Sequence, residues 1–117
     1  MLGNDIAGEI QSLPEASDTS GLAIGQRVML QPGTSCGRCL ACLSGDDFAC
    51  RSYRILGHGR AGGYAEFVAV PLASLIPIPD SISFESASAF PLVFLTAWRM
   101  LVARAQVKSG EDVLVWA

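Results

Sequence analysis

The sequence has 117 residues, a formal net charge of −3 and 50% hydrophobic residues, which suits one domain and leaves little room for a second. The slightly acidic balance argues against a nucleic-acid surface, which needs a basic face, and the high apolar content excludes a disordered chain. No signal peptide is recognised, and Pro91, Thr96 and Arg99 interrupt the longest apolar stretch, residues 87–102, so we expect no membrane span and a cytoplasmic protein.

Short strands are predicted along much of the chain before residue 82. Residues 26–30 follow a glycine-containing loop and read as a strand that ends before Pro32. Residues 62–70 place aromatic and β-branched side chains after a glycine pair, which favours another strand. Prolines on both sides limit residues 75–76 to a short strand.

The character changes to helical after this point. Ser83 is a plausible N-cap with Glu85 in the first turn, and Pro91 suits the first position of a second helix. Four apolar residues of that second helix recur at spacings of three and four: Leu95, Trp98, Leu101 and Val102. We expect this stripe to face the core and Arg99 to lie off it. Residues 108–112 read as a turn into a buried strand.

All four cysteines of the chain lie close together in a segment with little periodicity. They are Cys36, Cys39, Cys42 and Cys50, in the pattern Cys-x2-Cys-x2-Cys-x7-Cys. Two intervening residues allow neighbouring sulfurs to turn toward one ion about 2.3 Å away, as tetrahedral zinc requires. Four thiolates leave no open coordination position, so the pattern predicts a closed, structural zinc site.

Three other uses of the cysteines remain open. Two disulfides are possible in number, but no secretion signal accompanies them. A redox centre normally uses one Cys-x-x-Cys pair. An iron–sulfur cluster has similar spacing, although its fourth cysteine precedes proline and Cys50 precedes Arg51.

The lobe at residues 33–54 resembles the structural-zinc lobe of the zinc-containing alcohol dehydrogenases, in the medium-chain dehydrogenase/reductase superfamily. The sequence Gly-Gln-Arg-Val at residues 25–28 is similar to the family's Gly-Asp-Arg-Val turn. Gly-Gly-Tyr-Ala-Glu-Phe at residues 62–67 resembles a family strand, and residues 75–85 match the family's entry into its helical part. These matches occur in the family's order.

The resemblance implies an α+β fold that is mostly β. Residues 1–82 would be part of a GroES-like β-barrel catalytic domain containing the zinc lobe. Residues 83–117 would provide connecting helices and, at 111–117, the first strand of a Rossmann dinucleotide-binding domain. On this reading, the sequence is expected to be truncated at both ends.

The resemblance also implies a function. The full-length protein is expected to be an NAD(P)-dependent oxidoreductase related to alcohol dehydrogenases and quinone reductases, with a structural zinc, NAD or NADP, a small-molecule substrate and a homo-oligomeric assembly. The present chain alone is expected to be inactive. Thr96 resembles the family threonine beside the nicotinamide ring. The alternative is a helix threonine bonded to the carbonyl four residues earlier.

Several positions depart from the family's catalytic-zinc pattern. Asn4 and Asp5 stand where zinc-using members have histidine and glutamate, and Leu92 stands where they have cysteine. A neutral amide is a poorer zinc donor than imidazole, so we expect no catalytic zinc. The Gly-Asn-Asp segment is similar to the quinone-reductase branch. His58, the single histidine, matches no catalytic position.

Two alternatives from other functional classes remain. A stand-alone, zinc-stabilised interaction module would present a polar surface over its helices, whereas part of a dehydrogenase would expose apolar surface near residues 113–116. A redox switch would require zinc release on mild oxidation.

Overall fold

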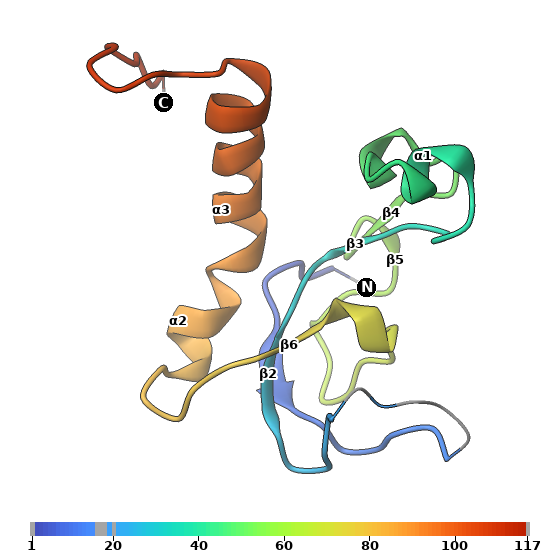
Figure 1. Cartoon of the computed structure of the whole chain (residues 1–117). Coiled ribbons are helices and arrows are strands. Elements are labelled where there is room, and N and C mark those ends of the chain that lie inside the picture. Colours follow the sequence, from blue (N-terminus) through green and yellow to red (C-terminus); the bar gives the residue numbers. More distant parts are fainter. Residues whose placement is uncertain (1, 16–18, 20, 117) are drawn as a thin grey trace.

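The computed structural model describes residues 2–15, 19 and 21–116. Within them, short strands form two small sheets, and helices occupy the lobe and the later part of the chain (Figure 1). The strands are β1 (Ala7–Glu9), β2 (Arg27–Leu30), β3 (Gly33–Thr34), β4 (Arg54–Leu56), β5 (Gly59–Arg60) and β6 (Leu75–Pro77). The helices are α1 (Leu40–Leu43), α2 (Phe84–Ser88) and α3 (Pro91–Trp98), the 3-10 turns η1 (Asp47–Ala49) and η2 (Leu72–Ser74), and the π-helix η3 (Arg99–Arg104).

The first sheet has the order β1-β2-β6 and is antiparallel throughout. Its central strand β2 confirms the strand predicted at residues 26–30, and β6 confirms the short strand at 75–76. Along β2 the side chains alternate, so that Val28 and Leu30 are buried as the two-residue period of a strand requires.

The core lies on one side of this sheet. Ile10, Val28, Leu30 and Leu56 form its buried cluster. Partly buried hydrophobic residues complete the packing: Ile6, Leu13, Leu22, Val68, Val70 and Leu75. Leu56 belongs to β4, so the core connects the first sheet to the second, which has the order β3-β4-β5.

The second sheet supports the cysteine lobe. β3 enters the lobe and β4 leaves it, and the two strands pair antiparallel with Thr34 opposite Arg54. The Thr34 hydroxyl also donates a hydrogen bond to the Arg54 carbonyl at 3.2 Å. The base of the lobe is therefore closed by backbone pairing.

The predicted helix starts are confirmed. The Ser83 hydroxyl accepts a hydrogen bond from the Ser86 amide at 3.2 Å, with Glu85 in the first turn of α2. The pKa of the Glu85 carboxyl lies below its ordinary value, because the carboxyl accepts a hydrogen bond from its own backbone amide and another from Ser83. Pro91 begins α3, where its missing amide donor costs nothing.

The predicted core-facing stripe of the second helix is wrong. Trp98 is 66% exposed, and Leu101 and Val102 are exposed as well. The helix rises away from the sheets (Figure 1). The side that faces the lobe carries Arg99, together with Leu95 as the one residue of the predicted stripe on the cavity wall. Periodicity identifies residues that share a face but does not identify the neighbour that covers it.

Two expected strands do not form in the described residues. Gly63 and Tyr64 donate backbone hydrogen bonds to the carbonyls of Gly3 and Leu2, but an open groove separates β1 from residues 65–70. Residues 111–116 follow the predicted turn without strand pairing, and residue 117 lies outside the described residues. A strand requires a paired neighbour along its length to satisfy its amides and carbonyls. In the described residues the first segment is paired only at Gly63 and Tyr64, and the second has no such neighbour.

One segment is long and apolar enough to cross a membrane by length and composition alone. It is Phe84–Arg104, 21 residues that comprise α2, α3 and η3. Arg99 lies within it and forms an ion pair with Asp46 of the lobe. The expected absence of a membrane span stays a prediction.

Candidate metal centre and the adjoining cavity

The lobe brings its four cysteines together by local turns. Cys36 follows β3, and Gly37, with φ of +68°, reverses the chain after it. Cys39 precedes α1 as its N-cap residue and Cys42 lies within α1. Cys50 follows η1. Three sulfurs thus come from one turn and its helix, and the fourth comes from the returning chain.

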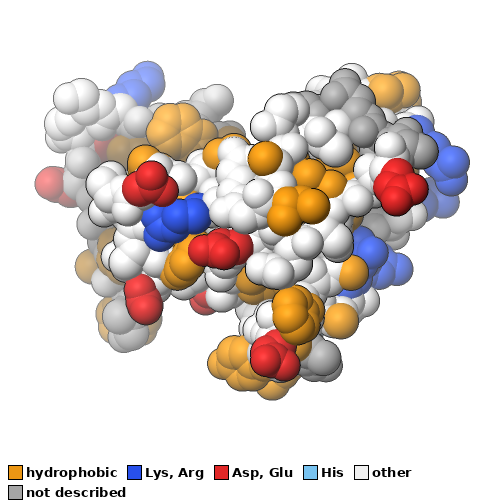
Figure 2. All heavy atoms as spheres, turned by 90° about the horizontal axis from the view of Figure 1, so that it is seen from below, with side chains coloured by type: hydrophobic (Ala, Val, Ile, Leu, Met, Phe, Trp, Pro, Cys, Tyr) orange, Lys and Arg blue, Asp and Glu red, His pale blue; other side chains and the backbone are white. Residues whose placement is uncertain are grey.

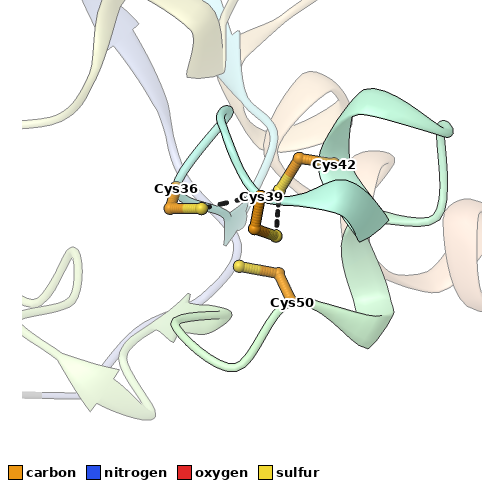
Figure 3. A group of neighbouring side chains, drawn as sticks. All are labelled: Cys36, Cys39, Cys42 and Cys50. Carbon is orange, nitrogen blue, oxygen red and sulfur yellow. Dashed lines mark hydrogen bonds between the residues drawn. The ribbon is translucent and has the colours of Figure 1, made fainter.

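The sulfurs form one compact group, with all four pointing toward a common centre (Figure 3). All four Sγ atoms lie within 4.8 Å of one another, with Cys39–Cys42 at 3.5 Å and Cys36–Cys42 at 3.9 Å. A tetrahedral zinc with bonds of about 2.3 Å separates its sulfurs by about 3.8 Å. The donor set and its spacing therefore fit a tetrahedral Zn²⁺.

The thiols of the group differ in their electrostatic surroundings. Backbone amides of Arg38 and Cys39 donate to Cys36 and lower the pKa of its thiol to about 6. Ser35 is the main cause of a lowered pKa at Cys42. A Cys42 backbone amide also lowers the pKa of Cys39, but contacts with neighbouring sulfurs and burial outweigh it and raise that pKa to about 11. Neighbouring thiolates repel one another, so a cation would relieve the conflict among them.

The end of α1 positions the segment between the third and fourth cysteines. The Gly45 amide donates to the Cys42 carbonyl at 3.1 Å and the Asp46 amide donates to the Ala41 carbonyl at 2.9 Å. This is the Schellman pattern, which places Gly45 in the left-handed region, with φ of +82°. Asp46 leaves the helix in a defined direction as a result.

A cavity of about 230 Å³ lies between the lobe and α3–η3. Its lobe and strand side consists of Pro32, Gly33, Phe48, Tyr53 and Ile55. Its helix side consists of Leu92, Leu95, Thr96, Arg99, Met100 and Arg104. Most of the wall is apolar, and Tyr53, Thr96 and the two arginines bring the polar groups.

Arg99 is a functional candidate that the sequence does not reveal directly. Its Nη2 lies 3.5 Å from Asp46 Oδ1, and its guanidinium carbon lies 3.8 Å above the centre of the Phe48 ring. Phe48 also contacts Tyr53, with ring centroids 5.2 Å apart. In the sequence, the one indication of a separate role is that Arg99 lies off the apolar stripe. Its contacts with Asp46 and Phe48 are seen only in the structure.

Thr96 makes a helix-internal hydrogen bond and lines the cavity, and its expected place beside a nicotinamide ring stays a prediction. Its hydroxyl donates to the Leu92 carbonyl at 2.7 Å, which is the helix-internal bond considered as the alternative. It also lines the cavity together with Leu92. The oxygen of Thr96 still has room to accept a hydrogen bond from a bound molecule.

The side chains at the family's catalytic-zinc positions are separate from the cysteine group. Within the described part of the chain, the metal-binding side chains that come together are the four cysteines, and Asp5 and His58 lie outside their group. His58 is exposed, and the loop at 57–62 packs against residue 3. A Cβ on Gly62 would approach the Gly3 carbonyl oxygen to 2.5 Å, so close packing accounts for this glycine.

Comparison with known proteins places these features in a family. The alcohol dehydrogenase GroES-like domain family matches residues 1–80. The chain is 34% identical over 115 residues to L-galactonate-5-dehydrogenase of Escherichia coli (strain K12) and 35% identical over 115 residues to L-threonine 3-dehydrogenase of Rhizobium etli (strain CIAT 652). Each match covers 98% of this chain and 32% of the relative. The chain therefore spans about a third of the length of these curated relatives.

Solved structures agree in fold over nearly the whole chain. An NAD-dependent alcohol dehydrogenase superposes with a TM-score of 0.88 at 47% identity, covering 95% of this chain and 32% of that protein. A cobalt- and zinc-bound thermostable alcohol dehydrogenase from Pyrobaculum aerophilum superposes with a TM-score of 0.82 at 29% identity, covering 95% and 33%. With the family match over residues 1–80, this chain belongs to the alcohol dehydrogenase GroES-like domain family.

Proposed function

We propose that this chain is part of an NAD(P)-dependent oxidoreductase and that its four cysteines hold a structural zinc. The relatives are dehydrogenases of sugar acids, threonine and alcohols, which supports oxidoreductase chemistry on a small molecule. Asn4, Asp5 and Leu92 supply no set of zinc donors, so the proposal includes no catalytic zinc. When bound, NAD(P) would supply the hydride acceptor or donor.

The observation that carries the zinc proposal is the gathering of four sulfurs within 4.8 Å. A zinc there would link both ends of the segment between Cys42 and Cys50 to the turn at Cys36. Because the lobe contains only a four-residue helix and a three-residue 3-10 turn, little else orders it. The metal is accordingly structural, with all four positions filled by protein.

The finer assignments follow from the same proposal. Residues 1–82 belong to the GroES-like barrel domain, and residues 83–117 belong to the connecting helices and the first Rossmann strand. Thr96 contacts the nicotinamide cofactor, which is NAD or NADP. Its place on the wall of the cavity supports this role.

The surface supports a dehydrogenase over a stand-alone interaction module. Phe94 is 56% exposed, and Leu114 and Trp116 are 85% and 90% exposed, whereas the module predicts a polar surface there. Figure 2 shows hydrophobic side chains exposed at several places on one face, with acidic and basic side chains among them. We infer a cytoplasmic homo-oligomer in the full-length protein, acting without nucleic acid or membrane.

Metal analysis of the purified chain tests the zinc proposal. We expect one zinc per chain, lost in Cys42→Ser and Cys50→Ser and retained in His58→Ala, the control for a donor outside the group. A folded chain with four free thiols and no metal would overturn the proposal. Iron with visible charge-transfer absorption would replace it with an iron–sulfur cluster.

A further inference from the structure

The lobe and the helix that carries Thr96 meet through side chains. Figure 1 shows the lobe with α1 and the column of α3 as separate parts of the molecule. Between them lies the cavity that Phe48 and Tyr53 line from the lobe side and Thr96 and Arg99 line from the helix side. The relative position of the two parts therefore depends on the few side chains that cross this space.

Arg99 makes two contacts across it, and both partners lie between Cys42 and Cys50. Its guanidinium stacks on the Phe48 ring at 3.8 Å and points an Nη2 toward Asp46 Oδ1 at 3.5 Å. Asp46 makes no side-chain capping bond to η1, so its carboxylate is available to the arginine. An exposed ion pair alone contributes little, but the guanidinium also lies over the Phe48 ring, which adds a cation–π attraction to the contact.

The same segment is held at both ends by the cysteine group. Cys42 begins it and Cys50 ends it, and the Schellman bonds at Gly45 set its direction. Ordering of the four sulfurs therefore orders Asp46 and Phe48. On the helix side, Thr96 lies three residues before Arg99, which places both on one face and both on the cavity wall.

We propose that Arg99 is a positioning residue that couples the four-cysteine lobe to α3, so that metal binding in the lobe sets the place of Thr96 at the cavity. This inference rests on the proposed function for the role of Thr96. Metal binding in the lobe would thus affect the helix side of the cavity, through the contacts of Phe48 and Asp46 with Arg99. Arg99 itself touches no reacting group.

Hydrogen–deuterium exchange on the whole chain, with zinc and after chelation under reducing conditions, tests the coupling. In the wild type, chelation should speed exchange in both the lobe (residues 36–50) and the helix (residues 91–104). In Arg99→Ala, the helix should exchange about tenfold faster even with zinc, chelation should add nothing there, and the lobe should respond as in the wild type.

Two further variants separate coupling from a general loss of stability. Arg99→Lys keeps the charge but loses the flat stacking surface, so it should give an intermediate effect. Arg104→Ala removes the same charge from the same cavity wall and should behave as wild type. If Arg99→Ala and the wild type show the same helix response to chelation, the proposal is overturned.

The test stays informative if the chain binds no zinc or if Arg99→Ala misfolds. Without zinc, the proposed metal site fails, and a double-mutant cycle of Phe48→Leu and Arg99→Ala on helix exchange decides the coupling alone. A non-additive effect supports it and additive effects overturn it. If Arg99→Ala misfolds, the cycle pairs Asp46→Asn with Arg99→Lys, one change on each side of the contact, because the Asp46 side chain is 54% exposed and tolerates the change.

Discussion

At the scale of single residues, a small set of charges and rings decides how the lobe meets the helix. Tyr53 lies beside Phe48. A Cβ on Gly33 would collide with the Tyr53 hydroxyl oxygen, so only glycine at position 33 leaves room for the Tyr53 ring. Burial raises the pKa of the Tyr53 phenol, Asp47 raises it further, and Arg99 lowers it. The phenol thus reports on the charges at the lobe–helix contact.

Tyr53 should ionise at higher pH in the folded chain than in the unfolded one. In a Tyr64→Phe background, which leaves Tyr53 as the single tyrosine, absorbance at the phenolate band against pH gives its pKa directly. Asp47→Asn should lower that pKa, because it removes a negative charge that disfavours the phenolate. Arg99→Ala should raise it, because it removes a positive charge that favours the phenolate.

The linked effect on stability has a defined sign. A raised folded-state pKa contributes stability that is fully present below the ordinary tyrosine pKa and is lost as pH rises through the folded value. The free energy of unfolding of the Tyr64→Phe chain, measured with denaturant, should therefore fall above about pH 10. Adding Tyr53→Phe should remove this fall. Equal ionisation in the folded and urea-unfolded chains would contradict the assignment.

At the scale of elements, the lobe helix α1 depends on its ends. Four residues, Leu40–Leu43, are far too few for an isolated helix. Cys39 and Cys42 tie its beginning and body to the sulfur group, and the Schellman bonds at Gly45 satisfy its last carbonyls. Contacts at its two ends therefore stabilise α1, and the same contacts position the residues that follow the helix.

Gly45→Ala should destabilise the lobe even though the added methyl group meets no neighbouring atom. A Cβ at φ of +82° costs about 1–2 kcal/mol, although no atom lies within 4 Å of that position. We expect about tenfold weaker zinc binding in competition with a chromophoric chelator. Gly8→Ala is the matched control, since its site is equally open and lacks the positive φ. Equal affinities in the two variants would argue against a role for the Schellman turn.

Local rules predicted the helix starts and the sulfur group because each depends on residues near in sequence. Ser83 caps α2 and Pro91 begins α3 through their own backbone chemistry, and cysteine spacing fixes which sulfurs can share an ion. The side of α3 that meets the lobe depends instead on Arg99 reaching Asp46, 53 residues away in sequence (99 − 46). Strand formation at 62–70 similarly depends on a distant partner, so sequence pattern alone could not decide it.

At the scale of the whole molecule, the buried core is small and the apolar surface is large. The buried cluster lies beside the first sheet, while α3 carries exposed Phe94 and Trp98 one turn apart. Apolar side chains at this spacing form a continuous strip on the helix. Such a strip favours contact with another protein surface over contact with water.

The chain should therefore self-associate through α3, by apolar contact. Burial of Phe94 and Trp98 between copies would be favoured by about 25 cal/mol for each Å² removed from water, and a net charge of −3 opposes it only weakly. Sedimentation velocity over a range of concentrations should show association that persists at high salt, because screening weakens charge contacts and leaves apolar ones in place. Phe94→Lys with Trp98→Lys should give a monomer, whereas the exposed change Gln11→Lys should not. A wild-type chain that stays monomeric at every concentration would contradict self-association through α3.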